Sequence, residues 1–110
     1  MVHQMKLNEN PFERIKNGTK TVEFRLYDEK RRKIKIGDKI QFSKLPNLQE
    51  KIEVEVLDIY IEKTFEELFK KIFNDEKDIQ QKAKLMNQFY SYQQEKEYGV
   101  VGIKIKVIKE

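Results

Sequence analysis

The alternation of apolar and polar residues predicts a set of short strands. Residues 19–27 are rich in β-branched and aromatic side chains, and Val22, Phe24 and Leu26 fall on one face. The opposite face would carry Thr21, Glu23, Arg25 and Tyr27. The same period of two marks residues 39–43, with Ile40 and Phe42 inward, and residues 52–62 and 101–107. These segments predict four strands, and residues 1–5 are either a frayed start or a first short strand.

Within residues 52–62 the apolar positions change parity. Ile52, Val54 and Val56 alternate first, and the pattern then continues at Leu57, Ile59 and Ile61. A shift of one residue turns every later side chain to the other face of a sheet. We therefore expect a β-bulge or bend near Val56, of the kind that helps a small sheet to close into a barrel.

Three other segments have the period of a helix. In the first, Asn10 is the expected cap, Pro11 suits the first helical position, and Gly18 ends the helix. A second helix is predicted after Thr64, where Thr64 and Glu67 form a capping box and an apolar stripe follows at Phe65, Leu68, Phe69, Ile72 and Phe73. A third is predicted from Asp78 to about residue 89, with Ile79, Ala83, Met86 and Tyr90 on one side.

Together these elements predict an α+β protein, a small sheet with a short N-terminal helix and two helices inserted before the last strand. A chain of 110 residues has the usual size of one domain, so we expect a single domain over residues 1–110. Residues 28–35 are expected to be a charged connection, and residues 90–99 a polar loop rich in tyrosine.

The composition excludes several classes of site and suggests an anionic partner. The chain has no cysteine, which excludes disulfides and thiolate metal sites, and it has no long apolar stretch or secretory signal pattern. We therefore expect a cytoplasmic protein without a membrane segment. Residues 1–44 contain 12 Lys and Arg against 6 Asp and Glu, a net charge of +6, whereas residues 45–110 contain 11 against 13, a net charge of −2. The basic half suits phosphate, although Lys and Glu can also simply solvate a surface.

The candidate site is a group of charged residues at the start of the strand over residues 19–27. Glu23 and Arg25 are two positions apart, about 7 Å along the strand, and point the same way. They form either an ordinary surface ion pair or one wall of a cleft. In a cleft, Arg25 binds a phosphate or a base edge, Glu23 accepts from an exocyclic amine, and Lys20 adds a second cation.

Further ligand-binding candidates lie around this strand and in the tyrosine-rich loop. Tyr92 is a candidate for stacking on a base, whereas Tyr90 and Tyr98 are expected to pack internally. Glu95 and Glu97 are expected to solvate the loop, and His3, the single histidine, to lie in a mobile start. No metal-ligand cluster and no glycine-rich phosphate loop occur, so no metal or cofactor is expected. The remaining ligand-binding candidates are Tyr27, Lys30, Arg31 and Arg32.

The stretch from Phe12 to Arg25, followed by Ile36 to Phe42, resembles an ASCH domain. The family pattern is a short helix, G-x-K-x-x-E-x-R on a strand, and G-D before the next strand; here these are Gly18, Lys20, Glu23, Arg25 and the pair Gly37–Asp38. The segment from Tyr98 to Ile103 also resembles the last strand of the family. The resemblance implies a β-barrel similar to the PUA fold, with a cleft where Lys20, Glu23 and Arg25 meet.

The resemblance also implies a function. Most members of the family are proposed to bind RNA or a nucleobase-like ligand, and one branch has been described as a ribonuclease with a lysine implicated. Another branch removes acetyl from N4-acetylcytidine with a lysine, a threonine nucleophile and a glutamate. The lysine matches Lys20, but Glu23 stands at the threonine position and has no hydroxyl to offer. The family's glutamate has no assigned match in residues 60–98.

Three hypotheses follow. The leading one is a protein that binds RNA or a modified nucleotide through Lys20, Glu23 and Arg25, with no membrane partner, as a monomer or weak dimer. The alternative is a small hydrolase acting on a nucleoside amide or on RNA, in which Glu23 is the general base and Lys20 or Arg25 stabilises the oxyanion. The third is a domain that binds a protein partner and no nucleotide.

Overall fold

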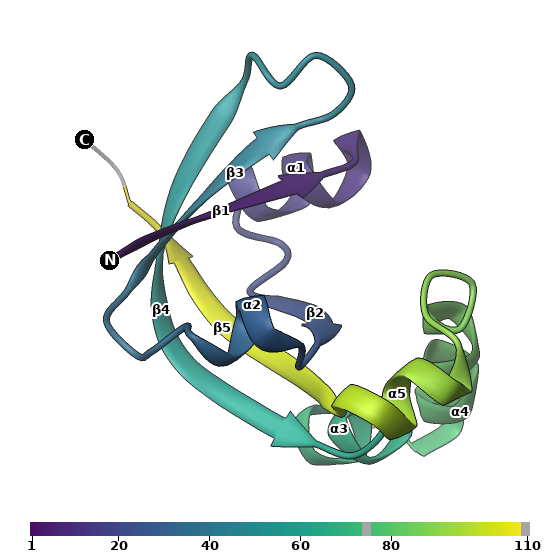
Figure 1. Cartoon of the computed structure of the whole chain (residues 1–110). Helices are drawn as coiled ribbons and strands as arrows, with labels where there is room; N and C mark the ends of the chain where they lie inside the picture. Colours follow the sequence, from purple (N-terminus) through teal and green to yellow (C-terminus); the bar gives the residue numbers. More distant parts are fainter. Residues whose placement is uncertain (74–75, 109–110) are drawn as a thin grey trace. The chain divides into compact units, whose positions relative to one another are not determined.

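The computed structural model describes residues 1–73 and 76–108, and its elements are labelled in Figure 1. The elements in chain order are β1 (Val2–Leu7), α1 (Glu9–Lys16), β2 (Val22–Leu26), α2 (Glu29–Arg32), β3 (Lys39–Lys44), β4 (Lys51–Glu62), α3 (Phe65–Ile72), α4 (Glu76–Met86), α5 (Tyr92–Tyr98) and β5 (Val100–Val107). The strands form one five-stranded sheet of order β1-β3-β4-β5-β2. The α+β class and the sheet with inserted helices therefore agree with the sequence prediction.

The chain divides into two compact units, each with its own apolar contacts. The first unit contains residues 1–23, residues 34–59 and the end of the chain from residue 103. In it, β1 pairs in parallel with β3, from Val2 opposite Lys39 to Leu7 opposite Lys44. β3 pairs antiparallel with β4, and Ile40 and Phe42 are fully buried as their alternation predicts.

The second unit contains residues 24–33 and 60–102, and the helices α3 and α4 supply most of its core. Thr64 accepts from the backbone N–H of Glu67 at 3.2 Å, which confirms the predicted cap of α3. The apolar stripe of α3 is buried or packs on the same cluster, and so does the predicted face of α4. The cluster comprises Leu26, Phe65, Leu68, Phe69, Ile79 and Val100, with Phe24, Tyr60, Ile72, Phe73, Ala83, Met86 and Tyr90 packed against it.

The predicted start of α1 was wrong by two residues. Asn8, and not Asn10, is the residue before the helix, and the first intrahelical bond runs from Phe12 N–H to the Asn8 carbonyl at 3.1 Å. Pro11 is consequently the third helical residue. It is tolerated there because the N–H groups of the first turn have no intrahelical acceptor. Phe12 and Ile15 are buried as predicted.

Both segments predicted as connections contain helices. Asp28 accepts from Arg31 N–H at 3.1 Å and so opens the short helix α2. Ser91 and Gln94 form a capping box that opens α5 where a loop was expected. The motif S-x-x-Q carries this signal in the sequence, but the polar composition of the segment concealed it.

The predicted change of buried face within β4 does not occur. Leu57 and Ile61 are 39% and 46% exposed, whereas Tyr60 packs on the core of the second unit. The face that is buried at Val54 and Val56 therefore stays the inward face as far as Tyr60. The predicted alternation did not include Tyr60. Of the two alternatives for residues 1–5, the short strand is confirmed and the frayed start is wrong, because β1 buries His3, Met5 and Leu7.

Candidate functional site

Lys20 and Glu23 form an ion pair at the beginning of β2. Lys20 Nζ donates to Glu23 Oε1 at 2.9 Å, and the side chains are 19% and 5% exposed. The turn that delivers them follows α1, where Gly18 has φ +85°, a left-handed conformation that suits glycine. Lys20 N–H then donates to the Arg14 carbonyl at 3.0 Å and ties the turn to the helix. The local sequence thus positions an ammonium group beside a carboxylate.

The burial of Glu23 is the feature that the sequence did not reveal. Alternation placed Glu23 opposite Phe24 and Leu26, on a face with other polar residues. In the structure Leu26 is buried, Phe24 packs on the core of the second unit, and Glu23 is also buried. β2 therefore buries a charged side chain as well as an apolar one. A charged pair with so little exposure gains little stability for the fold, because desolvation offsets most of the attraction.

Arg25 lies two residues after Glu23 on β2 and is half-buried. It belongs to the second unit, whereas Lys20 and Glu23 belong to the first. Lys20 also lines a hollow of about 690 Å³ in the first unit. Ile15, Ile105 and Lys106 are among its other walls, which gives an apolar floor next to cationic side chains.

Three of the other predicted ligand-binding residues meet in the second unit. Tyr27, Arg32 and Tyr92 line one hollow of about 860 Å³. The guanidinium carbon of Arg32 lies 4.4 Å from the centre of the Tyr27 ring, and Arg32 donates to the Tyr98 carbonyl at 3.1 Å. Tyr98 also lines this hollow and is 37% exposed, so it packs less tightly than expected.

The cations of α2 differ in burial and in the contacts that they make. Arg31 donates to Asp28 Oδ2 at 2.9 Å, so it helps to cap its own helix, and its Nε is buried without an acceptor among the described residues. Lys30 is exposed on the same helix. The charge of Arg31 is thus paired with the carboxylate that caps α2.

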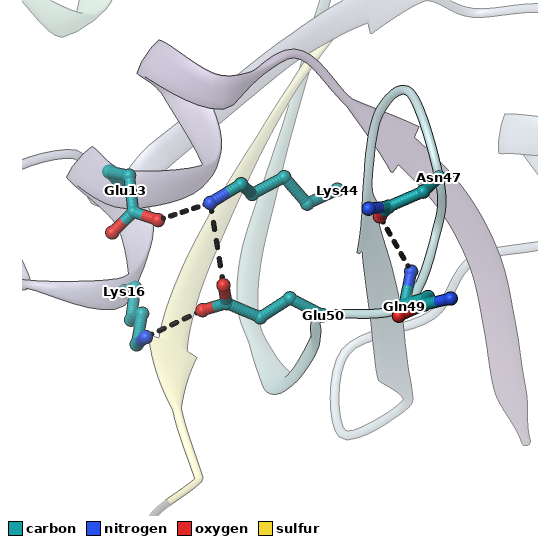
Figure 2. A network of polar contacts seen from close by, with 6 residues as sticks. All are labelled: Glu13, Lys16, Lys44, Asn47, Gln49 and Glu50. Carbon is teal, nitrogen blue, oxygen red and sulfur yellow. Dashed lines mark hydrogen bonds and ion pairs between the residues drawn. The ribbon is translucent and has the colours of Figure 1, made fainter.

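Part of the basic N-terminal half is also neutralised within the first unit (Figure 2). Lys44 donates to Glu13 at 2.9 Å and to Glu50 at 3.3 Å, and Lys16 donates to Glu50 at 2.6 Å. The hydrogen bond to Glu13 raises the pKa of Lys44, and the hydrogen bond from Lys16 lowers the pKa of Glu50. The formal excess of positive charge in residues 1–44 therefore overstates what a ligand meets.

Two buried polar residues were placed wrongly by the sequence. Glu95 was expected to solvate a loop, but it is 4% exposed and accepts from Phe65 N–H at 2.9 Å and from Asn87 Nδ2 at 3.1 Å. His3 was expected in a mobile start, but it is 9% exposed and lies 2.8 Å from Asp38 Oδ2. The available signals were the capping box before Glu95 and the alternation His3, Met5, Leu7.

The described part of the chain has neither a candidate metal site nor a candidate membrane-spanning helix. Residues 1–73 and 76–108 contain no group of three or more His, Cys, Asp or Glu arranged to hold a metal ion. Among the same residues, no helix has both the length and the apolar character needed to cross a bilayer.

Comparison with known proteins defines the family. The sequence model of the ASCH domain matches residues 5–109. The hypothetical protein PH0355, known from a crystal structure, is 40% identical with a TM-score of 0.83, over 98% of this chain and 100% of that one. Protein PF0455 from Pyrococcus furiosus, solved by NMR, is 36% identical with a TM-score of 0.74, and each chain is covered completely. A search of curated proteins found no match.

A more distant structure shares the fold. The S128A mutant of ZmASCH from Zymomonas mobilis is 15% identical with a TM-score of 0.66, over 98% of this chain and 71% of that one. This likeness supports the predicted α+β, PUA-like fold. The motif of Lys20, Glu23 and Arg25, the fold and the match over residues 5–109 lead to one conclusion: this chain belongs to the ASCH domain family.

Proposed function

We propose that this protein binds RNA or a modified nucleotide, with the Lys20–Glu23 pair as the centre of the site and Arg25 as a further contact. The observation that carries the proposal is the buried ion pair itself, with 2.9 Å between Lys20 Nζ and Glu23 Oε1 and 4% exposure of Glu23. A pair of this kind gains little for the stability of the fold, so its charged groups are better explained by a ligand than by a structural role.

The pair has the functional groups that a nucleotide needs. An ammonium carries three N–H donors, and in the described residues Lys20 gives one of them to Glu23, so others are available to a phosphate oxygen. The carboxylate of Glu23 accepts from donors on a base edge, as Glu does with the cytosine amine. Arg25 follows on the same face of β2 by strand geometry and offers a planar fork to phosphate or guanine.

Membership of the ASCH domain family supports the same ligand class, because proteins of the family are generally RNA-binding or hydrolase-like. Hydrolysis remains the alternative activity for the same residues. It would need Glu23 to take a proton from water while remaining in contact with Lys20, which then stabilises the oxyanion. Release of acetate from N4-acetylcytidine, or shortening of the RNA during the titration below, would favour this alternative.

The test is a titration with short single-stranded RNA at low and moderate salt. The variant is Lys20→Met/Glu23→Leu, because replacing both ions of a buried pair by apolar side chains preserves stability, whereas removing one leaves an uncompensated charge. We expect at least about tenfold weaker binding at both salt concentrations, and a comparable loss in Arg25→Ala. The control is Lys51→Met, which removes an exposed cation from β4, a strand that does not neighbour β2 in the sheet.

The control variant is expected to lose only a small, salt-dependent part of the affinity, because distant cations act through diffuse attraction. Unchanged affinity in a folded Lys20→Met/Glu23→Leu protein would contradict the proposal. Equal losses in that variant and in Lys51→Met would also contradict it, because the binding would then be diffuse and not centred on the pair. Thermal unfolding of each variant verifies that the fold is intact.

A further inference from the structure

A second candidate site lies entirely within the second unit. The hollow of about 860 Å³ has the size of an ordinary small-molecule site and is walled by Tyr27, Arg32, Tyr92 and Tyr98. Tyr92 is 71% exposed, so a large aromatic surface faces solvent at its edge. An aromatic ring left this open on a structured helix can stack on a planar ligand.

One cation of this hollow is held in a fixed orientation. Arg32 stacks on Tyr27, with 4.4 Å between the guanidinium carbon and the ring centre, and donates to the Tyr98 carbonyl at 3.1 Å. Tyr27 N–H in turn donates to the Gly99 carbonyl at 3.0 Å. A guanidinium has five N–H donors, so a group held in this way is prearranged to bind a phosphate.

The carboxylates of the hollow limit the charge of the ligand. Glu62 contacts Lys71 at 3.2 Å, and Glu95 accepts from Phe65 N–H and Asn87, so the charges of both are engaged by the protein. Glu67 and Glu97 line the same hollow and are exposed, and the exposed cations Lys63 and Lys96 line it as well. With Arg32, the described lining of the hollow therefore holds three cations and four carboxylates. Carboxylates repel a chain of phosphates but accept hydrogen bonds from an exocyclic amine. The chemistry of the walls thus matches a ligand with a flat ring, an amine and a single phosphate.

We infer that this hollow binds one nucleotide whose base carries an exocyclic amine, with the base stacked on Tyr92 and Tyr98 and the phosphate held by Arg32. The amine donates to Glu67 or Glu97. The inference rests on the proposed function for the ligand class, a nucleotide, and adds a site that lies outside the Lys20–Glu23 pair and selects among bases.

The first test uses the absence of tryptophan from the chain. In the variant Tyr92→Trp the indole is the single tryptophan and replaces an exposed ring, so its fluorescence reports on stacking at this position. We expect CMP to quench it with at least about tenfold higher affinity than UMP, which has the same phosphate and no amine. Cytidine, which has the amine and no phosphate, should also bind more weakly than CMP.

The second test removes the prearranged cation. In the Tyr92→Trp background, Arg32→Met keeps an apolar side chain over Tyr27 and should weaken CMP binding about tenfold while leaving cytidine binding nearly unchanged. The control is Lys70→Met in the same background, because Lys70 is an exposed cation of α3 that does not line the hollow. It should leave both affinities unchanged. Thermal unfolding of each variant verifies the fold.

The outcomes separate this inference from the proposed function. No quenching by millimolar CMP, or quenching that Arg32→Met leaves unchanged, would overturn the inference even if Lys20→Met/Glu23→Leu still abolishes RNA binding. Equal affinities for CMP and UMP would overturn the selection for an amine. Preferential CMP quenching that persists in Lys20→Met/Glu23→Leu would establish the hollow as an independent site.

Discussion

A buried carboxyl group and a surface ion network show two ways in which this chain satisfies its charged side chains. In the second unit, Glu95 is 4% exposed and accepts from a backbone N–H and a side-chain amide. In the first unit, Lys44 lies between Glu13 and Glu50 at the surface (Figure 2). The side chains of Glu13 and Glu50 are 44% and 40% exposed, so water competes for both.

The difference teaches which polar contacts hold the fold. Glu95 accepts from the first N–H of α3, that of Phe65, which follows the capping residue of this helix. It also accepts from the side-chain amide of Asn87, which follows α4. Loss of Glu95 leaves the buried Phe65 N–H without this acceptor, which is costly for stability. The network around Lys44 can exchange its partners for water at little cost. The three predictions that follow test this contrast, from the largest expected effect to the smallest.

The variant Glu95→Ala should lose about 2 kcal/mol of the free energy of unfolding. The reason is that the Phe65 N–H then lacks its acceptor in a buried place, and the Asn87 amide keeps only the Tyr90 carbonyl as a partner. Denaturant-induced unfolding measures the change. The matched control is Glu97→Ala, two residues along the same helix and exposed, which should be nearly neutral. Equal stability of the two variants would show that the buried hydrogen bonds contribute little.

The variant Lys44→Met should lower the unfolding midpoint by less than Glu95→Ala does, and the effect should shrink in about 0.5 M salt. Screening weakens attraction between exposed charges, whereas the hydrogen bonds of Glu95 involve neutral donors. The measurement is thermal unfolding of both variants at low and high salt, with Lys51→Met, at an exposed position of β4, as control. A loss of stability in Lys44→Met that does not change with salt would show that this network behaves like the buried contacts of Glu95.

The smallest of the three effects on stability is expected at Asp38, and only at acidic pH. Its pKa is lowered, first by the hydrogen bond with His3 and then by the backbone N–H of Lys35. Because the folded value lies below that of the unfolded chain, the stabilisation is complete above the unfolded pKa of 3.8 and is lost as the pH falls through the folded value. Unfolding midpoints in acid should therefore fall less steeply in Asp38→Asn than in the wild type. Parallel pH curves for the two proteins would contradict this expectation.

The sequence was sufficient wherever a repeated pattern or a local motif defined the structure. The stripe of α3, the cap at Thr64 and the inward pair Ile40 and Phe42 follow from spacing alone, because a regular helix or strand turns such spacing into one apolar face. Family membership came from the same kind of signal, since the spacing of Gly18, Lys20, Glu23 and Arg25 is local. The alternation was misleading in β4, because Tyr60, on the face expected to be polar, packs against the core of the second unit.

The tertiary structure decided which polar side chains are buried and with what partners. Glu95 meets Phe65 across 30 positions of the chain, His3 meets Asp38 across 35, and Arg32 meets Tyr98 across 66. Glu23 has a partner three residues away, yet its burial could not be read from its place among polar residues. A local pattern indicates which face of an element is apolar. Which distant backbone or side chain covers a polar group is decided only when the elements pack, because burial and hydrogen bonding depend on the neighbours in space and not on those in sequence.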